Sequence, residues 1–313
     1  MSDTTYDYDQ LRQGIPALSN SAKLERINKG YSSDAKYIVY DPQERPLCLL
    51  RTYSIEQDAN KRLEFRALER MEEQGVRCSR PIEIGTLPDQ RLGYMIVSYI
   101  HGEEASEQLP LLSVEDQYAI GVEAGLELRK IHRIQGPADM KPWQERAEAK
   151  HRRYRQEYAK CGVRIEHKSA VFSFIDRHLP LMRDRPNRFQ HDDFHTGNLI
   201  IADGKLSGVI DFNRYDWGDP VHEFLKVGFF SADVSRPFAV GQIHGYYDHS
   251  EPDESFWRLY SLYVAMTIVS SVVWILKVKP EELDSMLGKI YKVIDDHDRF
   301  ELTVPRWYRA DWQ

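Results

Sequence analysis

Three side chains whose types suit phosphoryl transfer occur along one short segment of the chain: Asp193, Asn198 and Asp211. Apolar runs flank the dipeptide Asp203-Gly204 between the last two, and this pattern predicts a β-hairpin with a two-residue turn. Such a turn places Asn198 and Asp211 on neighbouring strand ends. Asp193 would lie on the loop that leads into the same hairpin. We therefore expect three oxygen-bearing side chains to converge at one end of a buried hairpin.

Hard oxygen ligands without a cysteine or histidine cage suit Mg²⁺. A further carboxylate beside such a metal can orient a hydroxyl nucleophile and accept its proton, as phosphoryl transfer requires. Taken singly, the same residues are ordinary turn formers, since Asp and Asn favour loops. A second alternative is a zinc hydrolase, because His191, Asp193 and His195 alternate and would share one face of a strand. Such a protein would copurify with stoichiometric metal.

The elements that precede this segment indicate a small lobe of mixed α and β structure. Residues 36–40, 47–51 and 94–100 are short runs of β-forming residues, and a turn separates the first two runs. Residues 54–57 match a capping-box pattern, so a helix is expected from Ser54 to Gly75. Residues 1–101 are therefore expected to form an N-terminal lobe.

Beyond Gly102 the sequence is mainly helical. Ser113 is expected to cap a helix that runs to His132. The apolar face of this helix would contain Ile120, Ala124, Leu128 and Ile131. Further helices are expected over residues 141–160, 170–182, 241–278 and 280–296, with a β segment between residues 189 and 212. Residues 102–313 are thus expected to form a larger helical lobe, which gives the chain an α+β, bilobal architecture.

Three motifs resemble the signature of the aminoglycoside phosphotransferase family, which has a protein-kinase-like fold. They are His191-Asp192-Asp193-Phe194-His195-Thr196-Gly197-Asn198, Val209-Ile210-Asp211-Phe212 and Gly218-Asp219-Pro220. The resemblance covers most of the chain and implies a small, β-rich nucleotide-binding lobe followed by a helical lobe with the catalytic loop and acceptor site. It implies that Asp193 is the catalytic aspartate and that Asn198 and Asp211 are Mg²⁺ ligands. Asp219 would brace the catalytic loop.

The same resemblance assigns nucleotide binding to the N-terminal lobe. The phosphate loop would contain Gly30, Ser32 and Ser33, although both serines are equally typical of a plain turn. Arg51 would contact the phosphates with Glu64 as its ion-pair partner. Without this context, a surface pair that contributes little to stability is an equal alternative. The hinge that contacts the base of ATP or GTP would consist of Ser98, Tyr99 and Ile100.

Three positions depart from the family pattern. Asp192 stands where glycine is usual, at a position expected to need a positive φ, which Asp tolerates better than most residues. Its charge beside Asp193 would repel nucleotide unless it points away. Arg51 stands where lysine is commoner, and the planar guanidinium of arginine binds phosphate in a different geometry from an ammonium. Glu223 replaces an Asp. None of these removes a part that the chemistry requires, but a pseudokinase that binds nucleotide without turnover stays open.

Composition limits the partners and the compartment. The chain has 313 residues with 42 Lys+Arg against 49 Asp+Glu, and the net charge of −7 argues against nucleic acid as the main partner. Three cysteines fit neither a disulfide framework nor a CxxC zinc site. The acidic, polar start indicates no targeting sequence. Residues 259–276 carry no charge, but hydroxyl side chains interrupt them, so we expect a buried helix and no membrane span. A cytoplasmic monomer or homodimer is predicted.

Charge in the C-terminal lobe points to two different kinds of acceptor. Residues 244–258 hold acidic side chains among aromatic ones, which would suit a cationic acceptor: Asp248, Glu251, Asp253 and Glu254. Residues 141–160 hold seven Lys/Arg against three Glu, which would not. Each segment is otherwise a solvated surface. Our hypothesis is an amine-bearing, antibiotic-type small molecule that is phosphorylated on a hydroxyl, as in antibiotic resistance. A metabolite kinase for a smaller amino alcohol is the alternative.

Overall fold

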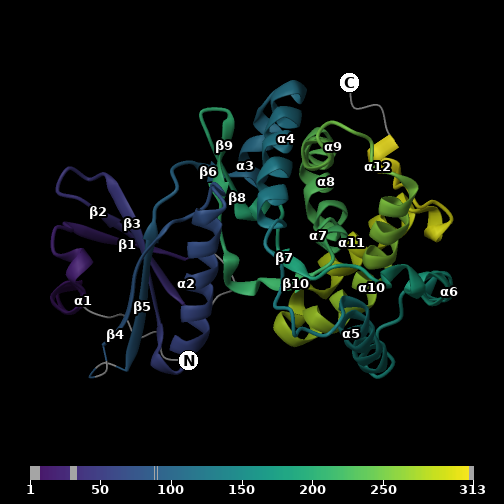
Figure 1. The fold of residues 1–313 in the computed structure, drawn as a ribbon, viewed down its shortest axis with the longest axis horizontal. Helices are drawn as coiled ribbons and strands as arrows, with labels where there is room; N and C mark the ends of the chain where they lie inside the picture. The colour runs from purple at the N-terminus through teal and green to yellow at the C-terminus, as the bar shows by residue number, and fades with distance from the viewer. Residues whose placement is uncertain (1–7, 29–33, 88, 90, 310–313) are drawn as a thin grey trace. The chain divides into compact units, whose positions relative to one another are not determined.

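The computed structural model describes residues 8–28, 34–87, 89 and 91–309 (Figure 1). The chain forms two compact units: Met1–His101 with Ser207–Asn213, and Gly102–Leu206 with Arg214–Gln313. Ser207–Asn213 belongs to the first unit, which corrects the predicted boundary that places this segment in the C-terminal lobe. Backbone pairing explains the difference, because the Val209 amide donates a hydrogen bond to the Arg77 carbonyl (2.8 Å).

A five-stranded antiparallel sheet forms the centre of the first unit, in the order β1-β2-β3-β5-β4. The strands are β1 (Lys23–Ile27), β2 (Ala35–Tyr40), β3 (Pro46–Ser54), β4 (Pro81–Leu87) and β5 (Leu92–Ser98). The predicted strands over residues 36–40, 47–51 and 94–100 are confirmed to within a few residues. Their β-branched and aromatic side chains suit a pleated, half-buried surface.

Side chains alternate between the two faces of this sheet, as strand geometry requires. On one face, Leu50 and Ile96 belong to a buried cluster with Leu11 of α1 (Tyr8–Gly14). Helix α2 (Asp58–Glu73) lies on the other side of the sheet (Figure 1). Arg51 follows Leu50 in β3, so its side chain points toward the α2 face.

The predicted capping box at Ser54 is wrong. Ser54 precedes a short 3-10 helix (Ile55–Gln57) and makes no side-chain hydrogen bond to the helix amides; its hydroxyl donates to Glu56 instead. Helix α2 therefore begins only at Asp58. It ends before Gly75, whose φ of +65° ends the helix where the sequence predicts.

Helices dominate the second unit. They are α3 (Ala105–Gln108), α4 (Val114–Ile131), α5 (Trp143–Tyr158), α6 (Lys168–His178), α7 (Pro220–Glu223), α8 (Ala232–Val234), α9 (Arg236–Tyr246), α10 (Glu254–Val278), α11 (Leu283–Asp296) and α12 (Arg306–Arg309). The predicted helix over 241–278 is wrong as one element, because α9 and α10 divide it. Asp253 starts α10 by accepting a hydrogen bond from the Phe256 amide (2.8 Å).

Helix α4 agrees with its prediction. The Ser113 hydroxyl accepts a hydrogen bond from the Asp116 amide (3.1 Å), which caps the helix. The predicted apolar face (Ile120, Ala124, Leu128 and Ile131) is buried. This helix crosses α9 at close range, because a Cβ atom at Gly125 would lie 2.2 Å from the Gln242 carbonyl oxygen. Glycine is therefore required for the backbones to approach this closely.

Helix α10 is the one element of the described chain that is long and apolar enough to cross a membrane by length and composition. About 67% of its most apolar window is buried inside the structure. Tyr260 and Tyr263 are among its fully buried side chains. This burial favours the expected role of α10 as a core helix.

Short strands position the segment singled out by the sequence analysis. β7 (Arg188–Gln190) pairs with β10 (Asp216–Gly218), and β6 (Glu103–Glu104), β8 (Leu199–Ala202) and β9 (Lys205–Val209) form a second small sheet. Asp203 and Gly204 both have positive φ (50° and 70°), as a tight two-residue hairpin turn requires. The predicted hairpin turn is confirmed.

Candidate active site

The loop from His191 to Asn198 joins β7 to β8 and carries Asp193. Asp192 adopts a φ of +62°, so the expected left-handed conformation at this position is confirmed. Asp and Asn tolerate this region better than other non-glycine residues. The chain turns sharply at this residue, and the backbone amides of Asp192 and Phe194 then donate to one buried carboxylate.

That carboxylate is Glu223 at the end of α7. Its Oε2 accepts a hydrogen bond from the Asp192 amide (3.0 Å), and its Oε1 accepts one from the Phe194 amide (3.3 Å). Burial by itself would raise the pKa of Glu223, but nearby His132 and His191 outweigh burial and lower it. Glu223 is therefore ionised, and it holds the loop on both sides of Asp193.

The carboxylate of Asp219, predicted to brace this loop, has other partners in the structure. Asp219 accepts hydrogen bonds from Arg185 (2.7 Å) and from the hydroxyl of Tyr263 (2.7 Å). It also caps α7 through the Val221 amide. Only its backbone carbonyl supports the loop, by accepting from the Gln190 side chain (2.7 Å) just before His191. Glu223 braces the loop directly because its longer side chain reaches the amides.

Asp193 lies between two potential cations. Its Oδ1 is 2.7 Å from Lys226 Nζ and 3.5 Å from His195 Nε2. Burial by itself would raise the pKa of Asp193, but the hydrogen bond from His195 and the charge of Lys226 outweigh burial and hold that pKa well below its usual range. Asp193 is thus an ionised acceptor, suited to orienting a hydroxyl group.

Lys226 was missed by the sequence reasoning. A signal was present, because Lys226 follows Glu223 by three residues in a helical stretch and so lies on the same face. The structure shows that Glu223 binds the loop, and Lys226 on the same face therefore faces the loop too. The Lys226 ammonium lies 5.5 Å from the ring centroid of Phe230, and this ring also packs against His195.

Asn198 contacts the backbone of Asp193, while the predicted convergence of their side-chain oxygens stays a prediction. Its side-chain Nδ2 donates a hydrogen bond to the Asp193 backbone carbonyl (2.9 Å). Because the amide nitrogen is engaged, Oδ1 is the atom left to accept a metal, and a hard oxygen donor fits Mg²⁺. Asp211 has a φ of +69° and lies in the first unit. Its pairing with Asn198 around one metal stays a prediction.

The zinc alternative has no support in the described residues. Among the described residues, no group of three His, Cys, Asp or Glu side chains could hold a metal ion. The two histidines instead stabilise the loop: His191 Nδ1 accepts from the Asp193 amide (3.3 Å), and His195 Nδ1 accepts from the Gly197 amide (3.1 Å).

The first unit contains a buried ion cluster of four side chains: Asp34, Arg51, Lys61 and Glu64. The expected Arg51–Glu64 ion pair is present. Asp34, which the sequence analysis missed, lies 2.6 Å from Arg51 Nη2 and 2.6 Å from Lys61 Nζ. Lys61 also lies 3.3 Å from Glu64. Arg51 therefore shares its donors between two carboxylates, and its contact with nucleotide phosphate stays a prediction.

Lys61 precedes Glu64 by three residues in α2, so helix periodicity could have identified it. No comparable signal identifies Asp34, because it lies 17 residues before Arg51 and meets it only through strand pairing.

The remaining predicted nucleotide contacts are only partly described. Gly30, Ser32 and Ser33 lie outside the described residues. Ser98 ends β5, where its hydroxyl accepts a hydrogen bond from the Arg80 amide (2.8 Å). The ring of Tyr99 packs edge-on against His101, with ring centroids 5.0 Å apart. Ile100 lies beside Gly208. The roles of Ser98, Tyr99 and Ile100 as a hinge stay predictions.

Comparison with known proteins gives one family match and many similar structures. Residues 23–260 match the model of the phosphotransferase enzyme family. No curated protein matches the chain. Among solved structures, a ternary complex of aminoglycoside phosphotransferase APH(4)-Ia with AMP-PNP and hygromycin B has a TM-score of 0.67 at 15% identity, covering 93% of this chain and 98% of that one.

Two further structures are similar. The gentamicin complex of APH(2")-IIa has a TM-score of 0.65 at 17% identity, covering 92% of this chain and 97% of that one. ADP-bound APH(2'')-Ib has a TM-score of 0.63 at 16% identity, covering 96% and 98%. At these identities the likeness shows a shared fold, in agreement with the α+β architecture predicted from the sequence.

Proposed function

The chain belongs to the phosphotransferase enzyme family, and on this premise we propose that it transfers the γ-phosphate of ATP or GTP, bound with Mg²⁺, to a hydroxyl group of a small-molecule acceptor. One observation carries the proposal. An ionised Asp193 lies on a loop whose amides are held by Glu223, with the Asn198 amide fixed against the same loop. Phosphoryl transfer depends mainly on such positioning of charge.

In this mechanism Asp193 accepts a hydrogen bond from the acceptor hydroxyl and aligns it for in-line attack. Because its pKa is held low, Asp193 is a weak base, so we expect it to orient the hydroxyl and to take the proton late in the reaction. Lys226 lies at the same carboxylate, where its ammonium would stabilise charge on the transferred phosphoryl group.

Asn198 and Asp211 would hold Mg²⁺, which would neutralise charge on the phosphate oxygens when bound. We propose that Gly30, Ser32, Ser33 and Arg51 bind the phosphates and that Ser98, Tyr99 and Ile100 contact the base. The proposal for Arg51 rests on the family resemblance at its position in β3; in the structure its guanidinium donates to Glu64 and Asp34.

The acceptor class is open between antibiotics and metabolites. The similar structures are described with gentamicin, streptomycin or hygromycin B, so aminoglycosides are the first acceptors to test. The acidic segment that suggested an amine-bearing acceptor gives this idea little support, because its carboxylates have local partners. Asp253 caps α10, Glu251 lies 3.4 Å from His244, and Asp248 and Glu254 lie 3.9 Å from Arg129 and Arg258.

The test is nucleoside diphosphate release with Mg²⁺ and ATP or GTP, against aminoglycosides, macrolides, small amino alcohols and hydroxy acids. We expect one acceptor class to stimulate turnover, and Asp193→Ala to abolish it while nucleotide binding persists. Full activity of Asp193→Ala would refute the assignment of the catalytic residue. Nucleotide binding without turnover for any acceptor would favour the pseudokinase.

A further inference from the structure

Helix α5 lines a hollow of about 810 Å³ in the second unit. This volume is within the range of small-molecule sites. Five cationic side chains line it (Lys141, Arg146, Lys150, Arg152 and Arg153), against two carboxylates, Glu145 and Glu148. The lining therefore carries a net charge of +3, although the chain as a whole is acidic.

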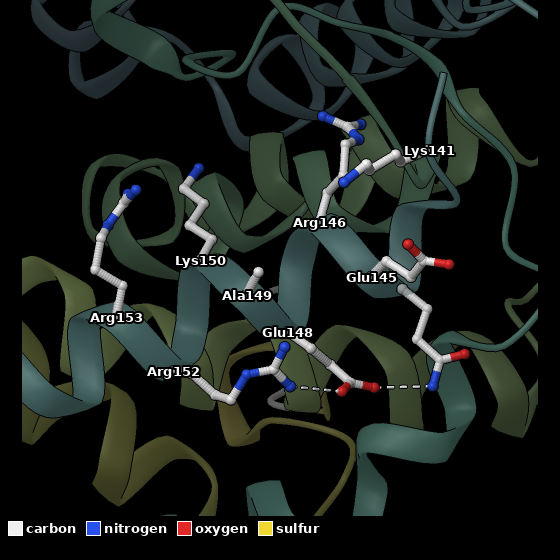
Figure 2. Close-up of a pocket in the computed structure, with 9 residues that line it drawn as sticks. Lys141, Glu145, Arg146, Glu148, Ala149, Lys150, Arg152 and Arg153 are labelled. Atoms are coloured by element: carbon white, nitrogen blue, oxygen red, sulfur yellow. Dashed lines mark hydrogen bonds and ion pairs between the residues drawn. The ribbon is translucent and has the colours of Figure 1, made fainter. Parts of the chain in front are cut away.

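The cations are arranged as a stripe. Arg146, Lys150 and Arg153 are four and three residues apart, a spacing that places them on one face of a helix. Figure 2 shows their side chains extending to the same side of α5, with the end of Lys141 turned toward Arg146. We call Lys141, Arg146, Lys150 and Arg153 the α5 basic stripe.

The nearby carboxylates do not neutralise this stripe. Glu148 is engaged by Arg152 (3.1 Å) and by the Gln144 side chain (2.8 Å), on a different side of the helix (Figure 2). Within the described part of the chain, Lys141, Lys150 and Arg153 form no ion pair with a carboxylate. Arg146 contacts Asp216 (3.3 Å), but its buried Nε has no hydrogen-bond partner among the described residues. Three like charges that lack an ion-paired carboxylate, gathered in one hollow, favour a bound anion.

The stripe lies next to the catalytic loop. Trp143, the first residue of α5, packs edge-on against His222 with ring centroids 5.0 Å apart. His222 Nδ1 lies 3.8 Å from the Asp192 carboxylate, which directly precedes Asp193. Arg146 ties α5 to Asp216, and Asp216 pairs in β-register with Gln190 at the start of the loop.

The charges agree with this placement. Burial raises the pKa of Asp192 to about 6, and the charges of Lys150 and Lys226 oppose this rise. Burial, followed by the charge of Lys150, lowers the pKa of His222 to about 3. The charge of Lys150 therefore acts on two groups that flank the catalytic loop, Asp192 and His222.

We propose that the α5 basic stripe binds an anionic group of the acceptor, a carboxylate, phosphate or sulfate, through Lys150 and Arg153. The acceptor is then an anionic alcohol whose hydroxyl reaches Asp193 while its anion lies along α5. This inference rests on the proposed function for the reaction, but the anion site itself does not require turnover. The proposed acceptor is thus an anion, in place of the cationic, amine-bearing acceptor of the sequence-based hypothesis.

Binding tests the site without a reaction. The probe is inorganic sulfate, titrated into the full chain by calorimetry, with Lys150→Met, Arg153→Met and their double variant. Lys160→Met, just beyond the end of α5 and outside the hollow, is the matched control because it removes the same charge. We expect saturable sulfate binding whose Kd rises about tenfold or more for each stripe variant, as for a charge-assisted hydrogen bond. Lys160→Met should bind like the wild type.

Two binding results overturn the inference: no saturable binding to the wild type, or the same Kd in the wild type and the double variant. The second would mean an adventitious ion elsewhere. Thermal unfolding of each variant shows whether it is folded, so a loss of binding is not confused with a loss of structure.

Turnover then tests the acceptor class. Three alcohols of similar shape and different charge are compared: glucuronate, glucose and glucosamine. We expect the highest kcat/KM for the anion, with a KM that rises about tenfold in Lys150→Met and is unchanged in Lys160→Met. A preference for glucosamine that Lys150→Met strengthens would overturn the acceptor assignment. Absence of nucleotide binding would instead refute the proposed function, and sulfate binding would still decide whether the stripe is an anion site.

Discussion

Replacing Asp34 by asparagine should destabilise the first unit strongly, because it unbalances the buried ion cluster. Asp34 Oδ2 accepts hydrogen bonds from Arg51 Nε (3.0 Å), Arg51 Nη2 (2.6 Å) and Lys61 Nζ (2.6 Å). The wild-type cluster has two positive and two negative charges. Asp34→Asn leaves two cations facing Glu64 alone. Arg51 and Lys61 are only 6% and 8% exposed, so water cannot replace the missing charge.

Breaking a buried ion pair by removing one partner costs about 3–5 kcal/mol. Asparagine keeps the shape of the side chain and one hydrogen-bond acceptor, so we expect the lower end, about 3 kcal/mol. At about 1.4 kcal/mol for each factor of ten, opening of the surrounding strands should become on the order of 100-fold more frequent.

The assay must report on the first unit. All six tryptophans lie outside it, at positions 143, 217, 257, 274, 307 and 312, so their fluorescence monitors the second unit. Hydrogen exchange of amides in β2 and β3, measured by mass spectrometry, reports on the cluster directly. The control is Asp176→Asn, which breaks an exposed ion pair with Arg155 (2.7 Å) and should cost at most about 1 kcal/mol.

The pH dependence of amide protection gives a second test of the same ion cluster. Burial would raise the pKa of Asp34, but the charges of Arg51 and Lys61 outweigh it and lower that pKa. The unfolded chain therefore takes up this proton first, and protection of β2 and β3 should fall as the pH drops below about 4. Asp34→Asn should lose part of this dependence. Exchange in β2 and β3 that changes less than about threefold in Asp34→Asn would refute the reasoning.

Three further predictions concern the catalytic loop. Lys226→Met should lower kcat about 10²–10³-fold by removing charge stabilisation at Asp193, and Lys226→Arg should retain part of the activity; equal single-turnover rates in wild type and Lys226→Met would exclude this role. Glu223→Gln should destabilise the second unit by about 1–3 kcal/mol, because its amide NH₂ cannot accept from the loop amide it faces, and tryptophan-monitored urea unfolding together with kcat tests this. Asp192→Ala should cost about 1–2 kcal/mol at a φ of +62° while Asp192→Gly should not; equal unfolding midpoints for the two variants would contradict the strain argument.

The amino-acid sequence by itself determines the local features of this protein. The Asp203-Gly204 turn follows from two adjacent residues that tolerate positive φ, and the Ser113 cap follows from a hydroxyl three residues from the amide it accepts. The order of the motifs from His191 to Pro220 predicts the family, and the family match agrees. Even local patterns fail where a competing partner is near, as at Ser54, whose hydroxyl turns to Glu56 instead of capping α2.

Only the tertiary structure decides which distant side chains meet. Lys226 reaches Asp193 across 33 positions of sequence, Glu223 reaches the Asp192 amide across 31, and Asp34 reaches Arg51 across 17. Each contact depends on how strands pair or helices pack around it, and neither propensity nor periodicity specifies this beyond a few residues. The basic residues of α5 show the same division. The sequence determines their spacing on one helix face. Only the packing of Trp143 against His222 and of Arg146 against Asp216 brings α5 beside the catalytic loop.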